Sequence, residues 1–94
     1  MITIIFTVDE LKSNHKFSFK NEESIRGSQL CGCFYCKEIF PATDVLSVDM
    51  ITEKDGILTA SCPICSIDAV LGDASVAISA ELLEAMNEYY FRTY

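Results

Sequence analysis

Five cysteines in two short clusters constrain the fold of this 94-residue chain more than any other feature. Three lie in CGCFYC and two in CPIC, and the two Cys-x-x-Cys pairs are separated by 25 residues. Each pair can form a tight knuckle that directs two sulfurs at one ion, and the segment between them has room for a β-hairpin. We therefore predict one structural Zn²⁺ held by four thiolates, those of Cys33, Cys36, Cys62 and Cys65.

Three other uses of the cysteines fit the sequence less well. Iron in the same four-sulfur geometry is an alternative metal. The CPIC sequence is similar to the CPxC of glutaredoxins, but those folds place it early in the chain and use a later proline, and no proline follows Pro63 here. A disulfide framework would leave one of five cysteines unpaired.

Cys31 is the cysteine outside both knuckles. It precedes Cys33 by two residues, a spacing that does not form the usual knuckle, so we expect a small buried apolar residue or an inert thiol. It is also an alternative ligand if Cys33 is displaced. Four apolar residues near the first knuckle are expected to cover the metal from water, namely Phe34, Tyr35, Ile39 and Phe40.

The length and composition predict a single domain over residues 1–94. A domain of this size buries only roughly 60 to 65% of the surface that its unfolded chain exposes, so a metal compensates for a thin core. The first residues lack the pattern of a signal peptide, and no apolar run approaches the length of a membrane span. We expect a soluble cytoplasmic protein, and in that reducing compartment clustered cysteines are more often metal ligands than disulfides.

Alternation of apolar residues predicts strands in the first part of the chain. Residues 2–8 alternate with a period of two, and residues 16–20, KFSFK, alternate again and are expected to pair with them. Asn21 is a candidate N-cap for a short helix with acidic residues in its first turn and Gly27 just past its end.

The second part of the chain predicts a hairpin and two helical segments. The turn EKDG contains Asp55-Gly56, a pair typical of a tight hairpin. Residues 66–72 are expected to form a short helical segment closed by Gly72. A final amphipathic helix would start at Ser79, with its polar side formed by Glu84, Asn87 and Glu88 and its apolar side by Leu82, Leu83, Met86, Tyr89 and Tyr90.

These elements predict the α+β class. The expected architecture is a small zinc-stapled domain with a zinc-ribbon or treble-clef-like core, in which two knuckles flank a β-hairpin. N-terminal strands and a C-terminal amphipathic helix would complete it.

Charge is divided unevenly along the chain. Residues 1–37 carry five Lys or Arg and four Asp or Glu, whereas residues 38–94 carry two and ten, so the two parts sum to +1 and −8. Four thiolates and one Zn²⁺ add −4 and +2, which takes the net charge from −7 to −9. A negative net charge opposes the binding of nucleic-acid phosphates. It favours an acidic surface, either merely solubilising or facing a basic partner.

Two stretches resemble a family of small bacterial and phage proteins, usually called cytoplasmic proteins. The stretches are CGCFYCKEIFP and CPICSIDAVLGD, and members of the family carry CGCFYC followed by CPxCGIDSVIG. The resemblance covers residues 31–73 and, more loosely, the C-terminal ISAELLEAMNEYYF. It implies that the same four cysteines are ligands in a zinc-ribbon or treble-clef-like arrangement. The chain departs from the family at Ser66, where the family has glycine.

The residue types needed for catalysis are sparse. Four cysteines close the metal's coordination shell, whereas a catalytic zinc keeps one position for water. His15, the only histidine, is predicted to be a surface turn residue. Asp68 and Asp73 are predicted to be first-turn and capping groups rather than a magnesium pair. We therefore expect no enzymatic activity.

Three functions from different classes follow. The one we favour is a protein–protein interaction module, including an acidic inhibitor or an immunity-like protein that covers a basic partner surface. The second is a nucleic-acid-binding zinc ribbon, and the third a small metal-dependent nuclease. We expect no membrane partner, and the oligomeric state is left open. The nucleic-acid function would depend on one basic footprint, formed by Lys12, Lys16, Lys20, Arg26 and Lys37.

Overall fold

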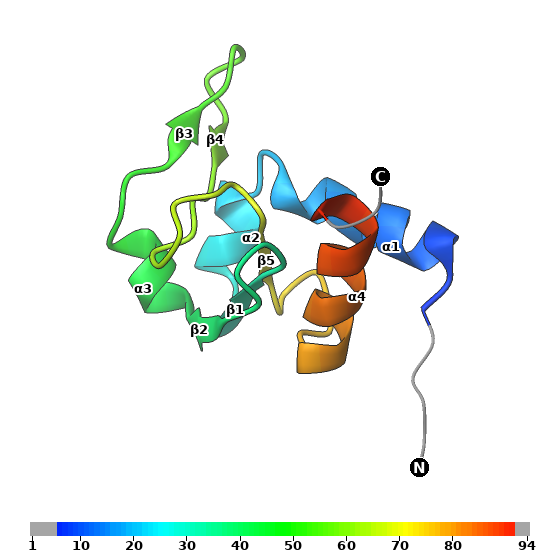
Figure 1. Cartoon of the computed structure of the whole chain (residues 1–94). Coiled ribbons are helices and arrows are strands. Elements are labelled where there is room, and N and C mark those ends of the chain that lie inside the picture. Colours follow the sequence, from blue (N-terminus) through cyan, green and yellow to red (C-terminus); the bar gives the residue numbers. More distant parts are fainter. Residues whose placement is uncertain (1–5, 92–94) are drawn as a thin grey trace.

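A three-stranded antiparallel sheet forms the centre of the molecule. The computed structural model describes residues 6–91, and its sheet has the strand order β2-β1-β5. The strands are β1 (Leu30–Cys33), β2 (Ile39–Pro41) and β5 (Val70–Gly72). Helices flank this sheet, and a separate two-stranded hairpin projects from the body (Figure 1). The α+β class with antiparallel sheets is therefore as predicted.

The register of β1 places its two cysteines on one face and Gly32 on the other. Cys31 pairs with Phe40 in β2 and with Gly72 in β5. Because side chains alternate along a strand, Cys31 and Cys33 share a face. A Cβ added at Gly32 would lie 2.8 Å from Leu83 Cδ1, so glycine lets α4 (Ala80–Phe91) approach the opposite face of the sheet.

Two short helices cover the face that carries the cysteines. They are α2 (Glu22–Arg26) and α3 (Ala42–Leu46), which contact each other as well as the sheet. Each contributes a fully buried side chain, Ile25 from α2 and Val45 from α3. The core therefore has two apolar layers, one on each side of the sheet.

The start of the chain is helical, so the predicted N-terminal strands are wrong where they can be examined. Residues 1–5 of the predicted strand lie outside the described residues, but α1 (Val8–His15) begins at its end. Thr7 and Glu10 form a capping box, in which the Thr7 hydroxyl oxygen accepts a hydrogen bond from the Glu10 N–H at 3.1 Å. The predicted partner strand, residues 16–20, begins instead with a 3₁₀ turn, η1 (Lys16–Ser18).

The hairpin predicted around Asp55-Gly56 is confirmed. It consists of β3 (Ile51–Thr52) and β4 (Leu58–Thr59), and Gly56 has a φ of 85°, which glycine adopts without strain. Lys20, which is distant in the sequence, contacts the hairpin at β4 and at the turn. The Lys20 N–H donates to Thr59 Oγ1 at 2.9 Å, and the Lys20 ammonium pairs with Asp55 at 2.6 Å.

The short helix after Asn21 is also confirmed, with a different role for Asn21. The residue occupies the N-cap position, and Gly27 the C-cap, but the Asn21 side chain makes no capping hydrogen bond. It is buried, and bonds three backbone groups from other segments, the carbonyls of Phe17 and Val70 and the N–H of Ala60.

The C-terminal helix is confirmed, and the helical segment predicted for residues 66–72 is wrong. Ser79 Oγ accepts from the Leu82 N–H at 3.1 Å, as expected of an N-cap. Asn87, predicted on the polar side of this helix, is buried and donates to the Tyr35 carbonyl at 2.8 Å. Val70 and Leu71 are fully buried in β5, because the sheet is covered on both faces there. Among the helices within residues 6–91, none has the length and apolarity required to span a membrane.

Candidate metal centre

The fold brings the two Cys-x-x-Cys pairs together. The first knuckle connects β1 to β2, and the second lies between β4 and β5. The four sulfurs lie within 4.8 Å of one another. Two contacts cross between the knuckles, Cys33 Sγ to Cys65 Sγ and Cys36 Sγ to Cys62 Sγ, both at 3.7 Å. The group formed by Cys33, Cys36, Cys62 and Cys65 can therefore hold a metal ion.

The two knuckles repeat one backbone pattern. The Lys37 N–H donates to the Cys33 carbonyl at 2.8 Å, and the Ser66 N–H donates to the Cys62 carbonyl at 3.0 Å. In both, the first cysteine's own N–H donates to the carbonyl five residues later, at 3.0 Å in the first knuckle and 2.9 Å in the second. The matched turns explain why two pairs distant in sequence present their sulfurs in the same way.

Backbone N–H groups also point at the first sulfur of each knuckle. The Tyr35 N–H lies 3.4 Å from Cys33 Sγ, and the Ile64 N–H lies 3.3 Å from Cys62 Sγ. Such donors stabilise a thiolate in preference to a thiol, because a charged sulfur is the stronger acceptor. These donors therefore act in favour of the thiolate, the form of cysteine that binds metal.

Each knuckle ends at a residue in the left-handed region of backbone conformation. Lys37 has a φ of 66° and Ser66 a φ of 70°. Glycine adopts this conformation without cost, whereas a residue with a side chain is strained by roughly 1 kcal/mol. Ser66 thus adopts a backbone conformation that glycine adopts more readily, and its knuckle keeps the same hydrogen-bond pattern as the first one.

Burial and hydrogen bonding act on the thiols in opposite directions. Burial raises the pKa of the Cys33 and Cys36 thiols. Burial also acts to raise the pKa of Cys62, but hydrogen bonds from the N–H groups of Cys65 and Ile64 and from the thiols of Cys65 and Cys36 together outweigh it, and the pKa is lowered. A cation at the centre must therefore displace protons from Cys33 and Cys36 as it binds.

The apolar residues expected to cover the site differ in burial. Phe34 and Phe40 are buried, as is the sulfur-bearing residue Cys33. Tyr35 and Ile39 are exposed, at 45% and 40% of their surface. Two of the four predicted cover residues are thus buried, and the other two are accessible to solvent.

Cys31 is buried and outside the four-cysteine group, as predicted. No part of its side-chain surface is exposed, and it packs within the core. Burial, followed by the charge of Asp73, raises the pKa of its thiol to about 11. Cys31 thus behaves as an apolar core residue.

The other candidate residues lie in unexpected surroundings. His15 is exposed, but it ends α1 and stacks on Tyr90 with ring centroids 4.2 Å apart. Asp73 accepts a hydrogen bond from the Gln29 N–H at 2.9 Å, in a turn after β5 rather than at a helix end. His15 and Asp68 line the same pocket, which the sequence analysis missed because its walls come from separate segments.

Comparisons of the chain with protein-family models, with curated proteins and with solved structures find no match.

Proposed function

We propose that the four cysteines bind one structural Zn²⁺ in a zinc-ribbon or treble-clef-like domain. A tetrahedral Zn²⁺ with bonds of about 2.3 Å places its sulfurs about 3.8 Å apart. The two contacts of 3.7 Å between the knuckles agree with that spacing. The motif's resemblance to the small bacterial and phage proteins supports the same ion.

We further propose that the protein is an acidic protein–protein interaction module. The observation that carries this proposal is the state of the basic residues that nucleic-acid binding would need. Three of the five are already paired with acids: Lys20 with Asp55, Arg26 with Glu22, and Lys37 with Glu84. These pairs leave little positive charge for phosphates, and favour a protein partner over a nucleic acid.

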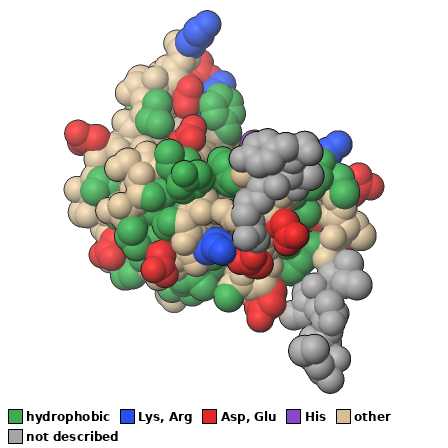
Figure 2. Space-filling view, in the orientation of Figure 1, with side chains coloured by type: hydrophobic (Ala, Val, Ile, Leu, Met, Phe, Trp, Pro, Cys, Tyr) green, Lys and Arg blue, Asp and Glu red, His purple; other side chains and the backbone are tan. Residues whose placement is uncertain are grey.

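The exposed surface of the described residues supports a protein partner of opposite charge. Acidic side chains outnumber basic ones on the face seen in Figure 2, where hydrophobic side chains gather at the centre. At the knuckles, Ile64 is 60% exposed and Tyr35 45%. Apolar anchors surrounded by charge are typical of protein interfaces.

The acidic residues of the second part of the chain are not equally suited to meet a basic partner. Asp55 and Glu84 are engaged in ion pairs, and Glu53 accepts a hydrogen bond from Thr59 Oγ1 at 2.6 Å. Asp49 and Glu81 are exposed. Substitutions that test charge without breaking internal bonds should therefore be made at these two.

A catalytic use of the metal is not part of the proposal. Four thiolates would complete the tetrahedral shell of Zn²⁺, and leave no position for a water nucleophile. We expect no hydrolysis of DNA or RNA when Mg²⁺, Mn²⁺ or Zn²⁺ is added. Activity that copurifies with the protein and is lost in His15→Ala or Asp68→Asn would contradict this.

The interaction is tested by capture from a lysate of the cells that encode the protein. Bound proteins are identified, and the affinity of each purified candidate is measured over roughly 50 to 300 mM salt. We expect a basic partner whose binding weakens with salt, and weakens further in a double variant, Asp49→Asn with Glu81→Gln. A matched variant, Thr43→Ala, changes an exposed neutral residue and should bind as the wild type does.

The nucleic-acid alternative predicts a different result. In a mobility assay with DNA and RNA at low salt, submicromolar affinity that is lost in Lys12→Ala with Lys16→Ala would overturn the proposal. The same double acidic variant would then bind nucleic acid more tightly, because repulsion is removed.

A further inference from the structure

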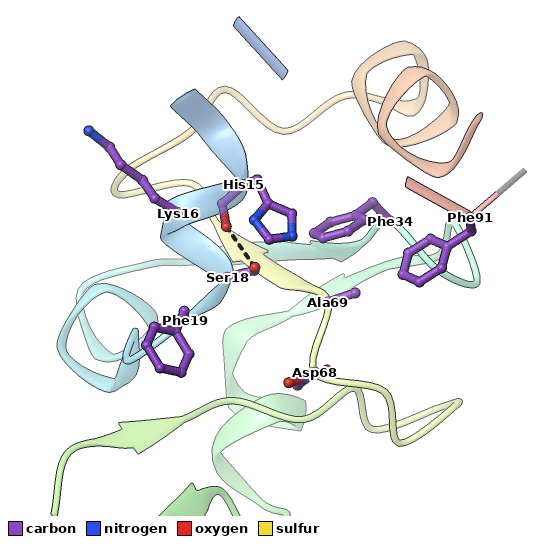
Figure 3. Close-up of a pocket in the computed structure, with 8 residues that line it drawn as sticks. All are labelled: His15, Lys16, Ser18, Phe19, Phe34, Asp68, Ala69 and Phe91. Atoms are coloured by element: carbon purple, nitrogen blue, oxygen red, sulfur yellow. Dashed lines mark hydrogen bonds between the residues drawn. The ribbon is translucent and has the colours of Figure 1, made fainter. Parts of the chain in front are cut away.

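A cavity of about 470 Å³ lies beside the metal centre, and half of the residues that line it are aromatic. The end of α1 and the residues after it form one wall, which includes His15 and Phe19 (Figure 3). The first knuckle contributes Phe34, and α4 contributes Phe91 at its end. A volume of this size is in the range of ligand pockets, which are typically apolar with a few polar groups.

The pocket contains one free anionic group. Asp68 lines it from the segment between the second knuckle and β5. Within residues 6–91 no hydrogen bond or ion pair engages the Asp68 carboxylate, and its side chain is exposed. An unpaired carboxylate at the edge of an apolar pocket can pair with a cation that the pocket walls also contact.

The positive residue of the lining does not neutralise this carboxylate. Lys16 belongs to the pocket wall, but its side chain points away from the other lining residues (Figure 3). Its Nζ lies 5.2 Å from the centroid of the Phe17 ring, on the outside of the pocket. Asp68 is therefore the charged lining residue that no other described residue neutralises.

The aromatic walls add a second attraction for cations. A cation within about 6 Å of a phenyl centroid is attracted by the negative face of the ring. Phe19 already has such a neighbour, since the Lys20 Nζ lies 5.2 Å from its centroid. Phe19 is half exposed, which leaves ring surface beyond the part that Lys20 covers for an incoming group.

We propose that this pocket receives an arginine side chain of the basic protein partner, with the guanidinium paired to Asp68 and stacked on the phenyl rings. A guanidinium suits the site better than an ammonium, because it is planar, stacks on aromatic faces and bonds a carboxylate through two N–H groups. The inference deepens the proposed function and rests on it for the identity of the partner's charge.

The pocket is tested separately from the partner with short capped peptides. The probes are Gly-Gly-Arg-Gly-Gly and the neutral Gly-Gly-Gln-Gly-Gly, added to isotopically labelled zinc-loaded protein and followed by amide chemical shifts. We expect the arginine peptide to shift the amides of Phe34 and Ala69 saturably, and the glutamine peptide to leave them unchanged. Affinity should fall roughly fivefold or more in Asp68→Asn and in Phe19→Ala.

The control variant is Asp44→Asn, an exposed acid in α3 that does not line the pocket and should leave the affinity unchanged. Equal responses to both peptides, or a response that survives Asp68→Asn, would overturn the proposal in favour of a merely apolar pocket. Binding seen only in Arg92→Gln would show that the chain's own arginine is the occupant. No shift in any variant would overturn the arginine site while leaving the salt-dependent capture of a basic partner to stand or fall by its own assay.

Discussion

Replacing Asn21 by alanine should cost a large part of the stability of this domain. The Asn21 Nδ2 donates to the carbonyls of Phe17 and Val70, both at 2.9 Å, and its Oδ1 accepts from the Ala60 N–H, also at 2.9 Å. The side chain thus connects η1, β5 and the end of the hairpin strand β4. Alanine leaves three backbone groups without their partner, and two of these belong to buried residues.

The expected loss follows from the cost of an unsatisfied buried group. Each such group costs about 1 to 3 kcal/mol, so the three together should cost about 3 to 9 kcal/mol, and the lower part of this range applies because Phe17 is only partly buried. A domain of this size has a total stability of roughly 5 to 15 kcal/mol. Urea unfolding of the zinc-loaded protein, followed by far-ultraviolet circular dichroism, measures the change. Zinc content is checked in each variant so that metal loss is not mistaken for a lost hydrogen bond.

Two further variants make the result interpretable. Asn87→Ala removes a buried amide that makes one recorded hydrogen bond, to the Tyr35 carbonyl, and should cost only about 1 to 2 kcal/mol. Asn21→Asp keeps the shape of the side chain but places an oxygen against two carbonyls. It should therefore destabilise at least as much as alanine. Wild-type stability in Asn21→Asp, or an Asn21→Ala loss no larger than that of Asn87→Ala, would refute the reasoning.

Three other predictions concern the cysteines and the knuckles. Cys36→Ser or Cys62→Ser should lose the zinc and largely unfold the protein, because structural zinc contributes on the order of 10 kcal/mol, whereas Cys31→Ser should keep one zinc per chain by metal analysis. Ser66→Gly should stabilise the protein by about 0.5 to 1 kcal/mol in thermal unfolding, since Ser66 has a φ of 70°; unchanged or lower stability would contradict a strained knuckle. The pKa of the Cys31 thiol is raised from 9.0 to about 11, so its protonated form contributes to the free energy of unfolding fully below pH 9, and this contribution is lost as the pH rises to 11. The loss is about 2 to 3 kcal/mol and should be visible in unfolding measured over a pH series. Cys31→Ala should remove this pH dependence.

The four-cysteine group could be predicted because its chemistry is local. Two residues between paired cysteines fix the shape of a knuckle, whatever surrounds it. The hairpin at Gly56 and the start of α4 at Ser79 were predictable for the same reason, since a turn glycine and a capping serine act on their immediate neighbours.

The errors lie where contacts distant in the sequence decide the structure. Residues 66–72 carry a mixed apolar pattern, and the pairing of Val70 with Cys33 selects a strand. Asn87 has the polarity of a surface residue, but the Tyr35 carbonyl of the first knuckle draws it inside. The start of the chain is an exception, since a local signal for a helix is present there: Thr7 and Glu10 have the spacing of a capping box.

The metal centre and the aromatic pocket share one piece of backbone. Phe34 follows the ligand Cys33, and its N–H donates to the Ala69 carbonyl at 3.0 Å, which joins the first knuckle to the segment after the second. Phe34 and Ala69 both line the pocket, and Asp68 lies directly before Ala69. An ion that holds the two knuckles together therefore also holds Asp68 against the wall formed by Phe34. On this reasoning the zinc that we propose would do more than compensate for a small core, because it would also set the distance between the carboxylate and the ring on which we propose the partner's arginine binds.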